Sequence, residues 1–244
     1  MCTTVKEAKL KKKYVPAASG AGRGVLSITT LKLLVLPLMV LDHIYVIFIN
    51  IFDIPIEFKY AGRIVYPIFI LAAVEGYYYT KDKKKYITRL LIASSLMHLG
   101  NYILNILISR YDGFILKTNI FIPILFIILI LYLLDNIKLK KNVLLSISII
   151  IFSLPLLNYI GQIPYVLLGL LLYYSRQNKL KQSIIYILYS LLFIGSYQIY
   201  MLAAFPLIYF YNGQKGKGYK YLFYTFYPAH IYVMYIISII ILRM

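Results

Sequence analysis

Three histidines are the side chains of this 244-residue sequence best suited to acid–base chemistry. Each follows a Lys or Arg by 9 to 11 residues, at His43, His98 and His230. On helices that rise 1.5 Å per residue, the three imidazoles lie at one depth, about 14 to 17 Å from that charged residue. Asp42 directly precedes His43, and Asn101 follows His98 by about one turn. Because imidazole exchanges protons near neutral pH, this polar layer is suited to proton transfer.

The stretches that carry these residues are strongly apolar. The sequence is 61% hydrophobic and only 14% charged, with a mean hydropathy of +0.78. Soluble domains are about half apolar and a quarter charged, so an ordinary soluble globule is excluded, as are disordered and collagen-like chains. The composition predicts an all-α, polytopic transmembrane helix bundle. The single cysteine, Cys2, excludes a disulfide framework and a multi-cysteine metal site, and we expect no metal.

Polar residues inside such helices need an explanation. An ionisable side chain at the centre of a membrane costs about 2.5 to 3.5 kcal/mol, so it is either compensated or functional. A single intramembrane histidine is as often an interhelical contact as a site residue. Three at one depth, with Asp42 added, favour a site. Asp42 and His43 point about 100° apart on a helix, so each is expected to find its partner on another helix.

Apolar runs between clusters of charge predict nine membrane spans, since each crossing takes about 20 residues. Residues 182–211 would measure about 45 Å as one helix, longer than a roughly 30 Å core. A break at Gly195-Ser196 therefore predicts a hairpin of two short pieces, and a tilted or broken helix is the alternative. The predicted spans are 30–52, 63–79, 86–109, 118–134, 142–158, 162–174, 182–195, 197–211 and 221–242.

The basic residues predict the orientation of this bundle. With the N-terminus in the cytoplasm, 21 of the 26 Lys and Arg fall in cytoplasmic segments, as the positive-inside rule requires. Residues 1–27 are predicted to form a basic, flexible cytoplasmic tail, and residues 28–244 one membrane domain. The net charge of +18 is then expected to meet anionic lipid and not nucleic acid. The expected location is a bacterial plasma membrane.

Several separated motifs resemble the TraX family, the conjugal-transfer pilin acetylases, in the same order along the chain. The resemblance covers roughly residues 28–242, and it is more specific than any one motif alone. The motifs are Leu41-Asp42-His43, Gly62-Arg63-Ile64-Val65-Tyr66-Pro67-Ile68-Phe69, Glu75-Gly76, Tyr211-Asn212-Gly213-Gln214-Lys215-Gly216 and the stretch from Lys220 to His230.

The resemblance implies transfer of an acetyl group from acetyl-coenzyme A, in the best-known case to the N-terminal amine of processed F-type pilin. The family is also distantly similar to multi-span acyltransferases that modify cell-surface sugars and heparan glucosamine. The expected partners are therefore acetyl-coenzyme A, a pilin-like peptide or a surface glycan, and the lipid bilayer. The positions that match the family are Asp42, His43, Arg63, Glu75, Asn212, Gly213 and His230.

Acyl transfer assigns expected roles to the polar layer. We predict His43 as general base, with His230 as an alternative base, an orienting residue or a donor to the carbonyl oxygen. Asp42 is expected to orient a histidine on another helix or to hold an ammonium group. His98 joins the predicted catalytic set from its depth alone. A covalent acyl-histidine is the alternative mechanism, whereas no pattern supports a Ser or Cys nucleophile.

Cofactor and substrate contacts are expected on either side of this layer. Glycines and lysines in the last inner loop suit phosphate groups, although positive-inside topology alone also produces such a loop. Arg63 either meets an acceptor carboxylate or anchors in the headgroups. Glu75 is expected to pair with Arg89 or to extend toward water, and ion pairing is expected ahead of any catalytic role. The predicted cofactor-binding residues are Asn212, Gly213, Lys215, Gly216 and Lys220, and the predicted substrate-binding residues are Arg63, Glu75 and Asn101.

Two other classes of function fit the same features. A proton-linked transporter would use the Asp and His layer as a proton relay. A noncatalytic assembly factor for a pilus or a conjugation system would need the membrane domain without its chemistry. The motifs favour the acetyltransferase.

Overall fold

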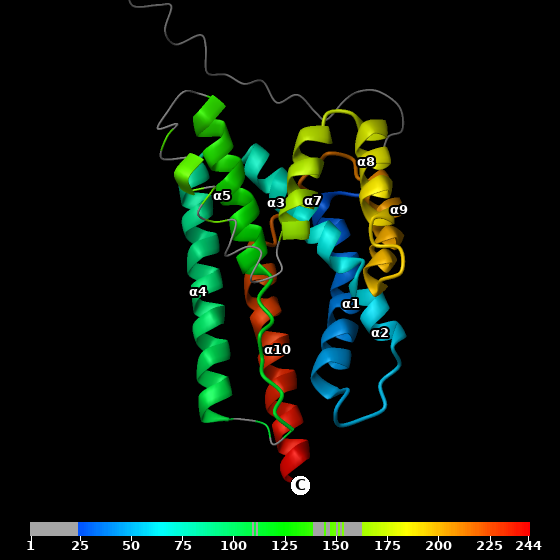
Figure 1. The fold of residues 1–244 in the computed structure, drawn as a ribbon, viewed down its shortest axis with the longest axis vertical. Helices are drawn as coiled ribbons and strands as arrows, with labels where there is room; N and C mark the ends of the chain where they lie inside the picture. Colours follow the sequence, from blue (N-terminus) through cyan, green and yellow to red (C-terminus); the bar gives the residue numbers. More distant parts are fainter. Residues whose placement is uncertain are drawn as a thin grey trace, which may run out of the picture.

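The computed structural model describes residues 24–138 except 109 and 111, then 144, 147–149, 151 and 153, and then 163–244. These residues form helices without a named strand, as the all-α prediction requires (Figure 1). The elements are α1 (Ile28–Phe48), α2 (Glu57–Gly62), α3 (Val65–Tyr79), α4 (Lys83–Leu107), α5 (Phe121–Lys138), α7 (Ile163–Ser175), α8 (Lys179–Leu191), the 3-10 helix η1 (Tyr197–Ala204), α9 (Phe205–Tyr209) and α10 (Lys220–Arg243).

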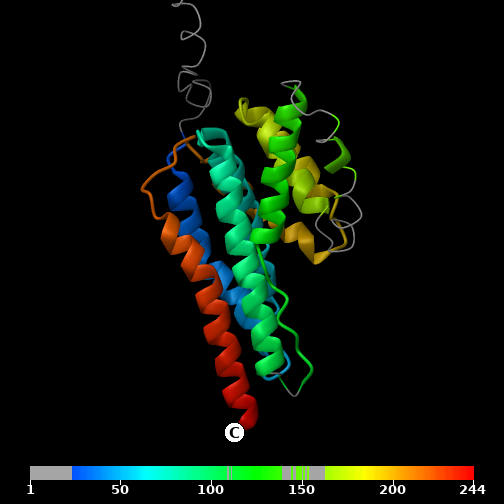
Figure 2. The same cartoon turned by 90° about the vertical axis from the view of Figure 1, so that its left-hand side faces the viewer.

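Three helices, α1, α4 and α10, are long and apolar enough to cross a membrane. They run along the long axis of the molecule (Figures 1 and 2). Large apolar side chains on α4 and α10, among them Leu96, Ile106 and Ile240, are exposed, as lipid-facing positions would be. The remaining predicted spans correspond to shorter helices, and most of the predicted span 142–158 lies outside the described residues.

The shorter helices α3, α5, α7, α8 and α9 gather in the upper half of Figure 1. In the lower half, residues 112–120 run without helix beside α4. The side-chain amide of Asn105 donates to the carbonyl of Leu116 and accepts from its N–H, at 3.0 and 2.9 Å. Asn101 Nδ2 donates to the carbonyl of Thr118 at 2.9 Å. Non-helical backbone inside a membrane protein is stable only where such groups satisfy it, so α4 supplies asparagines to this segment.

Residues 182–211 do not form one continuous helix. Helix α8 ends at Leu191, Gly195 adopts φ +88°, and the Ser196 side chain accepts from the N–H of Gln198 at the start of η1. Because α8 contacts both η1 and α9, the chain folds back on itself. The predicted break at Gly195-Ser196 is present.

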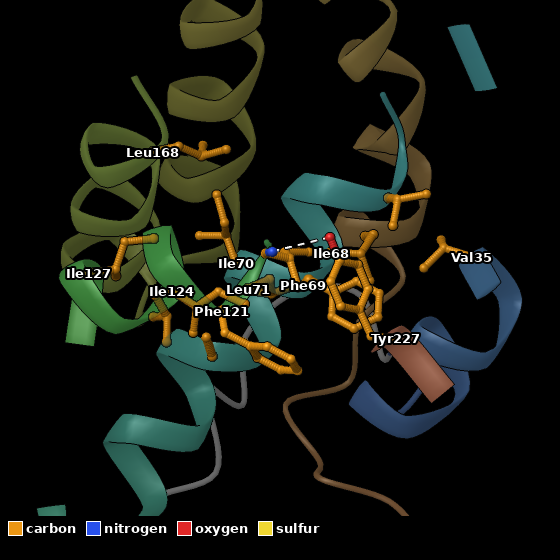
Figure 3. Close-up of a cluster of buried hydrophobic side chains, with 14 of the residues drawn as sticks. Val35, Ile68, Phe69, Ile70, Leu71, Phe121, Ile124, Ile127, Leu168 and Tyr227 are labelled. Carbon is orange, nitrogen blue, oxygen red and sulfur yellow. Dashed lines mark hydrogen bonds between the residues drawn. The ribbon is translucent and has the colours of Figure 1, made fainter. Parts of the chain in front are cut away.

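Helix α3 lies at the centre of the apolar core. It is apolar on all sides, and Ile68, Ile70 and Leu71 are completely buried. Figure 3 shows this run among side chains of α1, α5, α7 and α10, including Phe121 and Tyr227. The packing of α3 against these helices brings residues from the first and the last helix into one apolar core.

Candidate functional site

His43 and His230 meet at the contact between α1 and α10. Nε2 of His230 lies 3.1 Å from Nδ1 of His43. Nδ1 of His43 also lies 2.8 Å from the carbonyl oxygen of Met39, and Nδ1 of His230 lies 2.6 Å from that of Phe226. Each ring is thus held by the carbonyl one turn before it, as well as by the other ring.

For two neutral rings, one arrangement of protons satisfies all three contacts. A carbonyl oxygen only accepts, so both Nδ1 atoms carry protons, which leaves Nε2 of His230 as an acceptor. His43 Nδ1–H is then shared between Met39 O and His230 Nε2. Nε2 of His43 keeps its lone pair and has no hydrogen-bond partner among the described residues. This is the atom that a general base uses.

A cavity of about 850 Å³ adjoins this pair, and we call it the histidine cavity. Asp42, His43, His98 and Asn101 all line it. His98 is exposed, and its ring does not contact the other two imidazoles. Two of the three histidines of the predicted layer therefore touch, and the third lies on the wall of the same cavity.

Asp42 pairs with Arg63 and not with a histidine. Its Oδ1 accepts from Arg63 Nη2 at 2.8 Å, and both side chains are mostly buried. Gly62 makes this approach possible, because a Cβ at that position would collide with the Asp42 side chain. The Gly62-Arg63 motif is therefore explained by its fit to Asp42. Both members of the pair line the histidine cavity, so Arg63 lies inside the protein and not among headgroups.

Glu75 is buried beside Arg176 and Tyr211. Arg176 Nε donates to Glu75 Oε1 at 3.2 Å, and the Tyr211 hydroxyl donates to Oε2 at 3.1 Å. The expected ion pair of Glu75 thus exists, but its partner is Arg176 and not Arg89. Tyr211 thus joins the buried pair as a hydrogen-bond donor to the carboxylate.

A second cavity, of about 520 Å³, lies beside the loop that carries Lys215 and Lys217, and we call it the lysine cavity. Its charged lining comprises four cations, Lys32, Arg89, Lys215 and Lys217, and one carboxylate, Glu75. Since Glu75 is already paired with Arg176, the four cations give the cavity a positive field. Such groups bind phosphate through charge-assisted hydrogen bonds.

The loop that supplies Lys215 and Lys217 is fixed to the start of α1. The carbonyls of both lysines accept from the Thr29 hydroxyl, at 2.8 and 2.7 Å. Gly216 adopts φ +73°, and a Cβ there would collide with the Ser27 hydroxyl. The loop is therefore held by contacts from 27–29, and Gly216 is required by both its backbone angle and its surroundings.

Only part of the predicted cofactor set faces the lysine cavity. Lys215 lines it, whereas the Asn212 side chain accepts from the N–H of Gln214 and the Gly213 carbonyl accepts from the Tyr79 hydroxyl. The side chain of Lys220 lies outside the described residues. Lys32 and Arg89 were not in that set, because in the sequence they mark only the charged ends of apolar runs.

Tyr227 and Ile120 line both cavities. The Tyr227 hydroxyl accepts from the N–H of Ile120 at 3.1 Å, and its ring lies edge-on to both imidazoles, with centroids 5.8 Å apart in each case. These two residues form a common wall between the cationic cavity and the cavity beside the histidine pair.

The sequence matches the family model described as TraX protein over residues 27–238. The chain belongs to the TraX family. Comparison with curated proteins and with solved structures gives no match. Together with the apolar helices, TraX membership identifies a membrane protein with a conjugation-related role, and it is consistent with the pilin acetylase activity known in the family.

The separated motifs that resemble TraX converge in the structure. The Leu41-Asp42-His43 motif, Arg63 and His230 meet at the histidine cavity. Glu75 and Lys215 meet at the lysine cavity. The TraX motifs thus describe two adjoining cavities that share one wall.

Proposed function

We propose that this chain is an integral membrane acetyltransferase, which moves an acetyl group from cytoplasmic acetyl-coenzyme A to an amine, as on a pilin-like N-terminus, or to a surface glycan. The proposal rests on one observation. His43, whose Nε2 has no hydrogen-bond partner among the described residues, lines a cavity that shares Tyr227 and Ile120 with a second, cationic cavity. A base beside an anion-binding cavity is what transfer from a nucleotide thioester requires.

His43 acts as the general base of the transfer. Its Nε2 takes the proton from the acceptor as the acceptor nitrogen or oxygen bonds to the acetyl carbon and the carbon–sulfur bond breaks. That proton then passes to the departing sulfur, which leaves as free coenzyme A thiol. His230 is the positioning residue, since its Nε2 accepts the Nδ1–H of His43 and stabilises the imidazolium between the two proton transfers.

The lysine cavity supplies the contacts for the donor. Its cations suit the phosphates of acetyl-coenzyme A, and its tyrosines and apolar side chains suit the remainder of the molecule. Lys215 and Lys217 are exposed, so the cavity opens beside their loop. The thioester end of the donor passes the wall of Tyr227 and Ile120 to reach His43.

We call the loop that carries Lys215 and Lys217 the lysine loop. The arrangement fits a bacterial plasma membrane in which this loop lies in the cytoplasm. The loop lies at the end of the molecule opposite to the C-terminus (Figure 1), on the side where the positive-inside rule puts most of the Lys and Arg. The donor then enters from the cytoplasm, where coenzyme A is made, and the acceptor enters from outside or laterally from the bilayer.

Reconstitution tests the proposal. Liposomes with the full chain are given acetyl-coenzyme A labelled in the acetyl group, and label on peptide or glycan acceptors is measured together with free coenzyme A. We expect both to appear in equal amounts for wild type and to be lost in His43→Gln. Substrate flux without release of coenzyme A would indicate a transporter, and intact partner binding by a folded but inert chain would indicate an assembly factor.

A further inference from the structure

Three residues that line the histidine cavity have a buried polar side-chain atom without a partner within the protein. Among the described residues, the buried side-chain atoms that lack a hydrogen bond are the Tyr66 hydroxyl, Asn101 Oδ1 and the Thr118 hydroxyl. They come from α3, α4 and the non-helical segment, and all three residues line the histidine cavity. A buried polar atom without a partner costs about 1 to 3 kcal/mol, so three of them beside the same cavity indicate a ligand that satisfies them.

The hydrogen-bonding character of these atoms restricts the ligand. Asn101 Oδ1 only accepts, because the amide nitrogen is already used on the carbonyl of Thr118. The hydroxyls of Tyr66 and Thr118 both donate and accept. A ligand hydroxyl also donates and accepts, and so it satisfies all three groups. An ammonium group only donates, and it would leave the two protein hydroxyl protons without an acceptor.

The charge of the histidine cavity also favours an uncharged ligand. Its charged lining residues are Asp42, Arg63 and Lys117, and Asp42 is paired with Arg63. His43 and His98 add no negative charge. The lining therefore offers a cation no unpaired carboxylate, and a protonated amine would be desolvated there without a counter-ion.

From these groups we propose that Tyr66, Asn101 and Thr118 form the acceptor site, and that the acceptor is an uncharged molecule with several hydroxyl groups, such as a sugar, and not a cationic amine. The cavity volume of about 850 Å³ lies in the range of small-molecule sites. This inference rests on the proposed acetyl transfer and, between its two acceptor classes, disfavours an amine that binds as a cation. An acceptor hydroxyl held there would lose its proton to His43.

The test measures binding without turnover, so that it stays separate from the test of acetyl transfer. The full chain in nanodiscs, without acetyl-coenzyme A, is titrated with methyl glucoside, with glucosamine at a pH where it is cationic, and with a short peptide bearing a free N-terminus. We expect methyl glucoside to bind best. Thr118→Val keeps the side-chain shape and should weaken its binding about tenfold. Thr88→Val, an exposed threonine outside both cavities, should not.

Asn101→Asp keeps an acceptor oxygen and adds a negative charge, and it also removes the Nδ2 donor to the Thr118 carbonyl, so thermal unfolding of this variant is measured alongside. It should shift the preference about tenfold toward glucosamine. Binding of the peptide or of glucosamine to wild type at least as tightly as methyl glucoside overturns the inference. Equal binding of methyl glucoside by Thr118→Val and by wild type also overturns the inference, because it would mean that water alone satisfies these atoms. Neither result bears on the role of His43, which is tested separately by transfer of the labelled acetyl group.

Discussion

Nε2 of His230 lies 3.1 Å from Nδ1 of His43, although 187 positions separate the two residues in the sequence. The contact joins the first and last helices of the described fold and fixes which nitrogen of each ring carries the proton. It thereby leaves one basic nitrogen, Nε2 of His43, for a molecule in the histidine cavity.

Replacement of the two histidines should affect the rate to different extents. His43→Gln removes the base and should lower label transfer about a hundredfold or more, whereas the KM for acetyl-coenzyme A should change little, because the cations line a separate cavity. His230→Gln keeps an acceptor for His43 Nδ1–H and should lower kcat about tenfold. Initial rates in liposomes measure both. A His43→Gln variant that retains a tenth of the wild-type rate would contradict the role of this residue.

The cations of the lysine cavity should control affinity for the donor. Lys32 is partly buried with its Nζ 3.7 Å from the Phe223 ring centroid, so Lys32→Gln should weaken binding of coenzyme A about tenfold. Lys215 is exposed, and Lys215→Gln should have a smaller effect that added salt removes. Titration of the chain in nanodiscs with coenzyme A measures these changes. Lys181→Gln, an exposed change of the same charge outside both cavities, is the control, and an equal effect there would refute a specific site.

Two glycines with similar backbone angles should respond differently to substitution. Gly216 has φ +73° and its Cβ would meet Ser27, whereas Gly195 has φ +88° and faces open space. Gly195→Ala should therefore cost only the backbone strain of about 1 to 2 kcal/mol. Gly216→Ala should cost more and should also weaken coenzyme A binding, because the loop that carries Lys215 must move. Thermal unfolding and the same titration separate the two effects, and identical results for both glycines would exclude the contact with Ser27.

The depth of the histidines could be predicted from the sequence because the rise of a helix is fixed. Counting from the charged residue brought His43 and His230 to one level, and the structure adds that they touch. Counting gives height but not the face of the helix, so it also selected His98, whose ring makes no contact with the other two. The sequence also does not show which cation pairs with Glu75, because Arg89 and Arg176 both lie near the ends of helices.

The non-helical segment 112–120 could not be predicted from the local sequence. Hydropathy suggested a helix from residue 118, but α5 begins at Phe121. The preceding residues are held by Asn101, Asn105 and the Tyr227 hydroxyl, which lie on two other helices. Because these partners are distant in the sequence, only the tertiary fold shows that the backbone here is satisfied without a helix. Thr118, which lines the histidine cavity, was missed for that reason.

The buried pair of Glu75 and Arg176 should contribute to stability more than an exposed pair does. Both side chains are at most 6% exposed, and Arg176 also lies 3.2 Å from the Tyr78 ring centroid. Glu75→Gln leaves a buried guanidinium without its counter-charge and should destabilise the fold by about 3 to 5 kcal/mol. Lys83→Gln breaks a pair with Asp135 that is about 30% exposed, and it should cost at most about 1 kcal/mol.

A double-mutant cycle distinguishes the pair from two independent contributions. In Glu75→Gln with Arg176→Met, neither partner is left as an unpaired charge, so the double variant should be destabilised by less than the sum of the two single changes. Thermal unfolding in the same detergent measures all four proteins. Because Tyr211, at the end of the lysine loop, also donates to Glu75, the single variant should bind coenzyme A more weakly as well. Additive changes in stability would show that Glu75 and Arg176 do not act as a pair.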